Sequence, residues 1–395
     1  MPVTPPPFDH PHSSRSSDEA PMNMQVPAAS AAGGSAFPPV PGRSLFGTLP
    51  DGRVVEAVTI ADARGMTARL ITLGAGLQGL WVPDRAGRMG DVVLGHDDLA
   101  GYVERRSFLG GIVGRCANRI AGGRFRLDGR AFQVPCNDGP NSLHGGNQGL
   151  DMRLWTLEAV TPGSATFRYD SPDGEEGYPG ALSIRAVYAL DGQGALSLTL
   201  TAQTDAPTIV NLSSHAYFNL GGAVAGGDVL DHVLTLAADR FTPVDATLIP
   251  TGALSSVAGT VFDFRTPHRI GDRIRDAGDA QLRLGRGYDH NFALRAGGGP
   301  NPEPAARLEH PATGRVMELA TTEPGLQFYS GNALAGDLAG KGGRLYRQSA
   351  GLCLEPQRFP DAINQPDFPS PRLDPGQTYR HVSVYRFSTL AGAGG

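Results

Sequence analysis

The sequence is poor in lysine and in cysteine, and each shortage narrows the chemistry available to it. Of its 34 basic residues, Lys341 is the one lysine, and it stands among glycines. A Schiff-base mechanism would depend on this single residue, so we set that chemistry aside. The three cysteines, Cys116, Cys136 and Cys353, lack the close spacing of a metal knuckle or redox pair. We expect buried free thiols in a reducing compartment, the cytoplasm.

The sequence also lacks long apolar runs and a basic excess. No run approaches the length of a membrane-spanning helix, so no contact with a membrane is expected. The N-terminus does not show the charged-then-apolar order of a secretory signal, which again favours the cytoplasm. The net charge is -5, whereas a nucleic-acid partner would require a basic face. We therefore expect neither a membrane nor a nucleic acid as partner.

What the chain does contain is typical of β structure. Helical periodicity is scarce, and 54 glycines with 32 prolines favour many turns. Residues 1–42 are rich in Pro, Ser, Ala and Gly, with few large apolar side chains, and predict a disordered tail. Residues 43–391 show neither a linker nor a repeat of fixed period, which predicts a single domain. Hydrophobic residues, 40% of the chain, suffice for its core.

Short alternating or apolar runs between turns predict strands through most of this domain. One short helix is expected at Asp97–Val103. The predicted architecture is all-β, a single large antiparallel sandwich whose loops gather polar residues at one face. The expected strands are Val54–Ile60, Thr67–Leu73, Leu77–Val82, Asp91–Gly95, Trp155–Val160, Ser164–Tyr169, Leu182–Leu190, Ala195–Thr204, Val233–Ala237, Gln281–Leu284, Asn291–Leu294, Ala306–His310, Val316–Thr321, Gln327–Ser330 and Tyr379–Phe387.

Polar residues are concentrated between residues 110 and 155. The motif GRCANRI sets Asn118 beside Arg119, and in NSLHGG His144 precedes two glycines. Two alternating runs around Asp128-Gly129 predict a β-hairpin between the motifs. We expect this hairpin to hold two polar loops a fixed distance apart, with donors that suit a neutral sugar or polyol. A glycine-rich connection whose Arg and His cap strands is the better interpretation of this segment taken alone.

Four later motifs carry further polar groups. His215 lies in NLSSHAYFNL, and a single His in an apolar strand is more often a hydrogen-bonded core residue than a catalyst. In GYDHNF, Asp289 or His290 must face inward, because neighbours alternate along a strand. Gln327 stands between apolar neighbours in TTEPGLQFY. Glu355 follows the apolar run GLCL, and a carboxylate at the end of a buried strand is costly unless it is paired or functional.

With these motifs in this order, the chain resembles the aldose 1-epimerase (galactose mutarotase) family. The matching pieces are GRCANRI, NSLHGG, NLSSHAYFNL, GYDHNF, TTEPGLQFY and LEPQRFPDAINQP, with DVVLGHDDLAGY and GEEGYPG in addition. The resemblance extends from Leu45 to Phe387. It implies an antiparallel β-supersandwich that interconverts the α and β anomers of free aldoses such as galactose and glucose, a step of hexose metabolism.

The resemblance also implies roles for individual residues. Glu355 would be the base that takes the proton of the sugar's C1 hydroxyl, and His215 the acid that protonates the ring oxygen. No metal or organic cofactor is implied, and the expected partner is a small aldose bound by a monomer or weak dimer. Cys116, Ser213 and Ser214 stand where the family varies. The residues expected to hold the sugar are Asn118, Arg119, His144, Asp289 and Gln327, with His144 also near the ring oxygen.

The acid–base pair is compatible with neutral pH. Reference pKa values of about 4.3 for Glu and about 6.5 for His allow a carboxylate and an imidazolium to coexist, and we expect mutual attraction to widen that window. Three alternatives stay open. The residues His144, His215, Asp289 and Glu355 could bind a metal, although no paired spacing links them. Glu355 and Asp289 could be a glycosidase's carboxylates. A sugar-binding protein could keep the pocket without catalysis.

One further loop allows two interpretations. Ser171–Gly180 is long and mixes acidic residues with Tyr178, so it could form a wall of the site. An ordinary surface connection explains its composition equally well.

Overall fold

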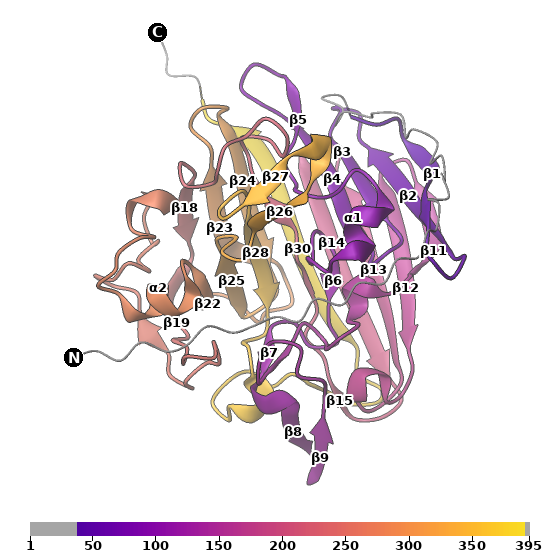
Figure 1. Cartoon of the computed structure of the whole chain (residues 1–395), viewed down its shortest axis with the longest axis vertical. Helices are drawn as coiled ribbons and strands as arrows, with labels where there is room; N and C mark the ends of the chain where they lie inside the picture. The colour runs from indigo at the N-terminus through magenta and orange to yellow at the C-terminus, as the bar shows by residue number, and fades with distance from the viewer. Residues whose placement is uncertain (1–37, 392–395) are drawn as a thin grey trace, which may run out of the picture. The chain divides into compact units, whose positions relative to one another are not determined.

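The computed structural model describes residues 38–391 (Figure 1). Within them, every pairing between named strands is antiparallel, as predicted. The predicted tail lies outside the described residues up to residue 37, and the first strand begins at Gly42. The division of the chain at residues 42 and 43 stays a prediction.

A nine-stranded sheet forms one layer. In Figure 1, β30 (yellow) continues the pink strands toward β24. Along β14 the side chains alternate between buried and half-buried, so Leu196, Leu198 and Leu200 face the core together. In spatial order the strands are β11 (Thr156–Thr161), β12 (Ser164–Ser171), β13 (Leu182–Leu190), β14 (Ala195–Thr204), β30 (Tyr379–Thr389), β24 (Arg315–Thr321), β23 (Glu303–Glu309), β18 (Val233–Leu236) and β21 (His268–Arg269).

Two smaller sheets pack on this layer. One hydrophobic cluster joins Leu198 of the large sheet with Leu80 and Phe328 of the smaller ones, which makes the fold a sandwich. The five-stranded sheet contains β1 (Gly42–Thr48), β2 (Val54–Ala61), β3 (Thr67–Ile71), β4 (Gly76–Pro83) and β5 (Met89–Asp91). The six-stranded sheet contains, in spatial order, β17 (Tyr217–Phe218), β28 (Leu352–Gln357), β25 (Gly325–Tyr329), β22 (Asp289–Leu294), β19 (Ala238–Phe241) and β20 (Ser255–Ser256).

Five two-stranded pairs, two short α-helices and six short 3₁₀ helices complete the regular structure of the described residues. Helix α1 (Leu99–Glu104) confirms the expected helix and begins after Asp98, whose side chain accepts from the N–H of Gly101. Within residues 38–391, no helix is long and apolar enough to cross a membrane. The pairs are β7 (Arg119–Ile120) with β10 (Ser142–Leu143), β6 (Ile112–Val113) with β16 (Ser213–Ser214), β15 (Thr208–Ile209) with β29 (Arg372–Leu373), β26 (Ala335–Ala339) with β27 (Leu345–Arg347), and β8 (Arg124–Leu127) with β9 (Arg130–Gln133).

The strand expected at Gln281–Leu284 is wrong, because these residues lie in helix α2 (Ala280–Gly285). The side chain of Asp279 caps this helix by accepting the N–H of Leu282 at 3.0 Å. Apolar and polar residues alternate at Leu282-Arg283-Leu284 as they would in a strand. In so short a segment the capping by Asp279 favours the helix instead. Arg286 follows with a φ of 55°, the left-handed conformation that often ends a helix.

Candidate active site

A cavity of about 610 Å³ lies against the six-stranded sheet, on the face turned away from the core. Side chains alternate between the two faces of each strand, so one face lines the cavity and the other packs into the core. Glu355 and Asp289 line the cavity, whereas Leu354 and His290 point into the core. We expected Asp289 or His290 to face inward, and both do, on opposite faces of the sheet. Asp289 lines the cavity, and His290 packs against Phe262 in the core.

His215 and Glu355 meet in this cavity although they are distant in sequence. His215 lies between β16 and β17, and Glu355 lies in β28, which pairs with β17. Nε2 of His215 is 3.8 Å from Oε2 of Glu355, and both side chains are buried. That carboxylate oxygen has no hydrogen-bond partner among the described residues. A buried oxygen without a partner is costly, which is typical of a group that serves a ligand or a reaction.

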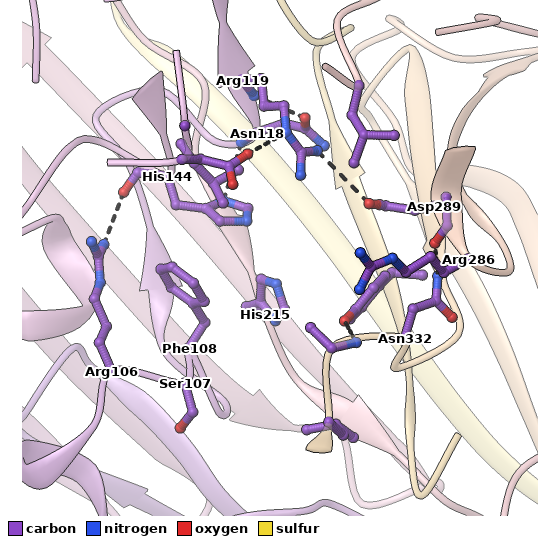
Figure 2. Close-up of a pocket in the computed structure, with 18 of the residues that line it drawn as sticks. Arg106, Ser107, Phe108, Asn118, Arg119, His144, His215, Arg286, Asp289 and Asn332 are labelled. Atoms are coloured by element: carbon purple, nitrogen blue, oxygen red, sulfur yellow. Dashed lines mark hydrogen bonds and ion pairs between the residues drawn. The ribbon is translucent and has the colours of Figure 1, made fainter. Parts of the chain in front are cut away.

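The loops that carry Asn118 and His144 are bound to each other through their backbones. The N–H of His144 donates to the carbonyl of Asn118 at 3.0 Å. The N–H of Asn118 donates in return to Nδ1 of His144 at 3.1 Å. Because that nitrogen accepts, the proton of the neutral imidazole is on Nε2. Both side chains line the cavity, as Figure 2 shows for His144 beside His215.

The first glycine after His144 allows the backbone of its loop to pass close to Gly114. Gly145 has a φ of 87°, and a Cβ there would lie 1.8 Å from the carbonyl oxygen of Gly114. A side chain at this position would therefore push the His144 loop away. The loops meet through the pairing of β7 with β10, in which Arg119 faces Leu143. The expectation that the hairpin β8–β9 spaces them is wrong; that hairpin forms, with its turn at Asp128-Gly129, but lies outside the cavity lining.

Arg119, next to Asn118, links two acidic side chains. Its Nε donates to Asp138 at 2.7 Å, and its Nη1 lies 3.7 Å from Asp289 (Figure 2). Gln327 donates from its amide to Asp289 at 2.7 Å. Arg119 and Asp289 line the cavity, whereas Gln327 does not and reaches it through Asp289. The structure therefore brings all seven predicted residues together, with Gln327 one contact behind the cavity surface.

Sequence reasoning missed the side chains that enclose the two imidazoles. Phe108 stacks on His215 with ring centroids 5.5 Å apart and lies 4.8 Å from His144. Tyr217 covers another side of His215 at 5.0 Å. Arg106 binds Asp151 through two nitrogens and also donates to the carbonyl of His144. Of these residues, only Tyr217 could have been found from the sequence, because it follows His215 by two positions in a strand-like run and so lies on the same face.

Burial decides the charge states of the site. It lowers the pKa of His215 from 6.5 to about 4, and it lowers the pKa of His144 well below 6.5. Burial also raises the pKa of Glu355 well above its ordinary value, and the neighbouring Asp289 adds to this shift. We expected mutual attraction to widen the pH range in which a Glu355 carboxylate and a His215 imidazolium coexist. That expectation is wrong, because both pKa shifts go in the opposite direction. Loss of hydration outweighs attraction and favours the uncharged form of each group.

His144, His215 and Glu355 form a cluster with the composition of a metal site, their ligand atoms lying within 4.8 Å of one another. A metal needs an unprotonated ring nitrogen. Nδ1 of His144 is already occupied by the N–H of Asn118, and Nε2 carries the imidazole proton. Hydrogen bonding thus makes His144 a donor toward the cavity rather than a ligand, which disfavours the metal-site interpretation.

The loop Ser171–Gly180 is not part of the cavity lining among the described residues. Glu176 in this loop instead accepts the N–H of Asn147 at 2.7 Å, directly after the glycines that follow His144. The loop therefore supports the His144 loop from behind.

Comparisons with known proteins identify the family of the chain. The sequence model of the family described as aldose 1-epimerase matches residues 56–386. A galactose mutarotase of Mus musculus is 45% identical over 88% of this chain and 98% of its own length. An aldose 1-epimerase of Escherichia coli K12 is 37% identical over 86% and 96%. The crystal structure of an aldose epimerase homologue from C. elegans superposes with a TM-score of 0.78 at 32% identity, covering 85% of this chain and 99% of that one. The chain belongs to the aldose 1-epimerase family.

Proposed function

We propose that this protein is an isomerase that interconverts the α and β anomers of free aldoses, with galactose and glucose as first candidates. Relatives named galactose mutarotase and aldose 1-epimerase support the activity. The observation that carries the proposal is the 3.8 Å approach of Nε2 of His215 to Oε2 of Glu355 in one cavity.

The short distance between His215 and Glu355 suits ring opening, in which bonds at neighbouring atoms of the sugar change together. The C1 hydroxyl oxygen and the ring oxygen O5 are both bonded to C1, so a base for one and an acid for the other must be close together. Glu355 takes the proton of the C1 hydroxyl, the C1–O5 bond breaks as C1 becomes a carbonyl, and O5 takes a proton from Nε2 of His215. Rotation about C1–C2 and the reverse steps give the other anomer.

The proton count of this cycle matches the charge states that burial favours. Ring opening converts a carboxylate and an imidazolium into a carboxylic acid and a neutral imidazole. The uncharged pair favoured by burial holds the same number of protons and corresponds to the state after ring opening. A bound sugar, by hydrogen-bonding to both groups, favours the charged pair that begins the cycle.

Hydrogen bonding distinguishes the two imidazoles. His144 cannot take a second proton without placing an N–H on Nδ1 opposite the N–H of Asn118. It therefore serves as a neutral donor that polarises O5 through Nε2. Among residues 38–391, no backbone N–H donates to Nδ1 of His215, which leaves His215 as the acid. The residues proposed to hold the sugar are Asn118, Arg119, His144, Asp289 and Gln327.

The test is a polarimetric assay of anomer interconversion with a panel of free aldoses, including galactose, glucose, L-arabinose and D-xylose. We expect acceleration over the spontaneous rate with at least one hexose. Binding of sugars without acceleration would favour a binding protein instead. Release of reducing sugar from an aryl glycoside would favour a glycosidase that uses Glu355 and Asp289.

We further propose a cytoplasmic location, which three unpaired cysteines support. Cys116 and Cys353 are buried as expected, whereas Cys136 is exposed. A monomer or weak dimer remains our prediction for the state in solution, and light scattering measures it.

A further inference from the structure

Cys353 is a buried thiol beside the proposed acid, and the cycle described above gives it no role. Its Sγ lies 3.5 Å from Nδ1 of His215. Cys353 and Glu355 are two residues apart in β28, so both side chains leave the strand on the same face. A single strand therefore presents the base to one nitrogen of His215 and the thiol to the other.

The acid role specifies which nitrogen of His215 must keep its proton. An imidazolium that donates from Nε2 becomes the neutral tautomer with its proton on Nδ1. That proton needs an acceptor throughout the cycle, and Sγ of Cys353 is the side chain within reach of it. A hydrogen bond with the backbone of His215 itself also favours the protonated ring. Burial raises the pKa of this thiol well above its ordinary value, so the sulfur stays uncharged.

An uncharged sulfur is a weak acceptor, and this suits an acid. A carboxylate at the same place would stabilise the imidazolium and make it reluctant to release its proton. The thiol can orient the ring without that stabilisation. His144 has the opposite arrangement, because its Nδ1 accepts a backbone N–H and its proton is on Nε2.

We propose that Cys353 is a positioning residue whose Sγ accepts the Nδ1–H of His215 and thereby leaves Nε2 as the nitrogen that exchanges a proton with the sugar ring oxygen. This inference rests on the proposed function, because the tautomer affects turnover only where His215 is the acid. Its consequence is that the two imidazoles of the site hold opposite tautomers.

The first test is ¹⁵N NMR of the full chain labelled at histidine, near neutral pH and without sugar. The His215 signals are assigned by their loss in His215→Asn. We expect the Nδ1–H tautomer for His215 and the Nε2–H tautomer for His144. An Nε2–H tautomer of His215 would overturn the proposal. This readout does not depend on turnover, so it separates failure of the inference from failure of the proposed function.

The second test removes the acceptor. Cys353→Ala should shift His215 toward a mixture of tautomers and lower kcat about fivefold with little change in KM, roughly the effect of losing one neutral hydrogen bond. Cys353→Ser, which restores an acceptor, should recover the tautomer and part of the rate. Cys116→Ala, which also removes a buried thiol, should leave the His215 tautomer as it is. An alanine variant at position 353 with wild-type tautomer and kcat would contradict the proposal, as would equal loss in the serine variant.

Discussion

Asn118 and His144 are joined by two reciprocal contacts, in which the backbone N–H of each residue donates to the other. Both residues have a positive φ, 62° for Asn118 and 50° for His144. Left-handed backbone is uncommon outside glycine, although Asn adopts it more readily than most residues. Two such residues facing each other indicate that the fold tolerates local strain in order to aim one imidazole into the cavity.

This strain predicts an order of stability for two variants. Both Asn118→Gly and Asn118→Ala remove the amide and keep the backbone N–H that binds His144. Glycine adopts the observed φ freely, whereas alanine resists it at a cost of the order of 1 kcal/mol. We expect the alanine variant to be the less stable of the two in urea unfolding. Equal midpoints with equal slopes would contradict this account of the loop.

Replacement of the proposed base should separate activity from stability. Glu355→Gln should lower the rate of anomer interconversion by roughly two to four orders of magnitude. The free energy of unfolding near neutral pH should not fall, because a neutral amide replaces a carboxyl whose charged form burial opposes. Polarimetry measures the first quantity and urea titration the second. A near-normal rate in this variant would exclude Glu355 as the base.

Replacement of the proposed acid should act on turnover more than on binding. His215→Asn keeps a polar group in the cavity but cannot deliver a proton to O5. We therefore expect kcat to fall far more than KM rises. Initial rates over a range of galactose concentrations give both constants. An effect confined to KM would place His215 among the groups that only hold the sugar.

The activity should persist to unusually low pH for a histidine-dependent reaction. The active pair holds one proton, and a second proton enters only as the pH falls toward the pKa of His215, about 4. On the alkaline side the pair loses its proton as the pH rises through the raised pKa of Glu355. The profile of kcat/KM should be bell-shaped with its acid limb near 4. An acid limb near 6.5 would indicate an unperturbed histidine instead.

The buried histidines should contribute less to the stability of the fold on the acid side of neutrality. Burial lowers the pKa of His215 to about 4, and of His232 and His290 to about 3. In the unfolded chain these residues take up protons near 6.5, so below that pH the unfolded state binds more protons than the folded one. The contribution of these histidines to stability is then full above 6.5 and is lost as the pH falls toward 4 and 3. The raised pKa of Glu355 contributes in the opposite direction, because the folded state binds its proton more readily. In urea titrations at several pH values, Glu355→Gln should therefore lose stability on acidification more steeply than the wild type; an equal or shallower loss in the variant would contradict this account.

The sequence by itself determined many of the longer strands and the types of residue in the site. Strand alternation is a local pattern, and it predicts Leu182–Leu190 and Ala195–Thr204 with their observed bounds. The same alternation separates Glu355 from Leu354 across β28. The motifs that resemble a known family identified Glu355 and His215 before any geometry was available.

Other properties were decided only by the tertiary structure. The distance between His215 and Glu355 depends on how β17 pairs with β28, and the contact between the Asn118 and His144 loops depends on how β7 pairs with β10. The shifts in pKa depend on how much water the surrounding rings exclude. These are contacts between segments far apart in the chain, and a local pattern carries no information about which distant segments meet or how dry their contact is.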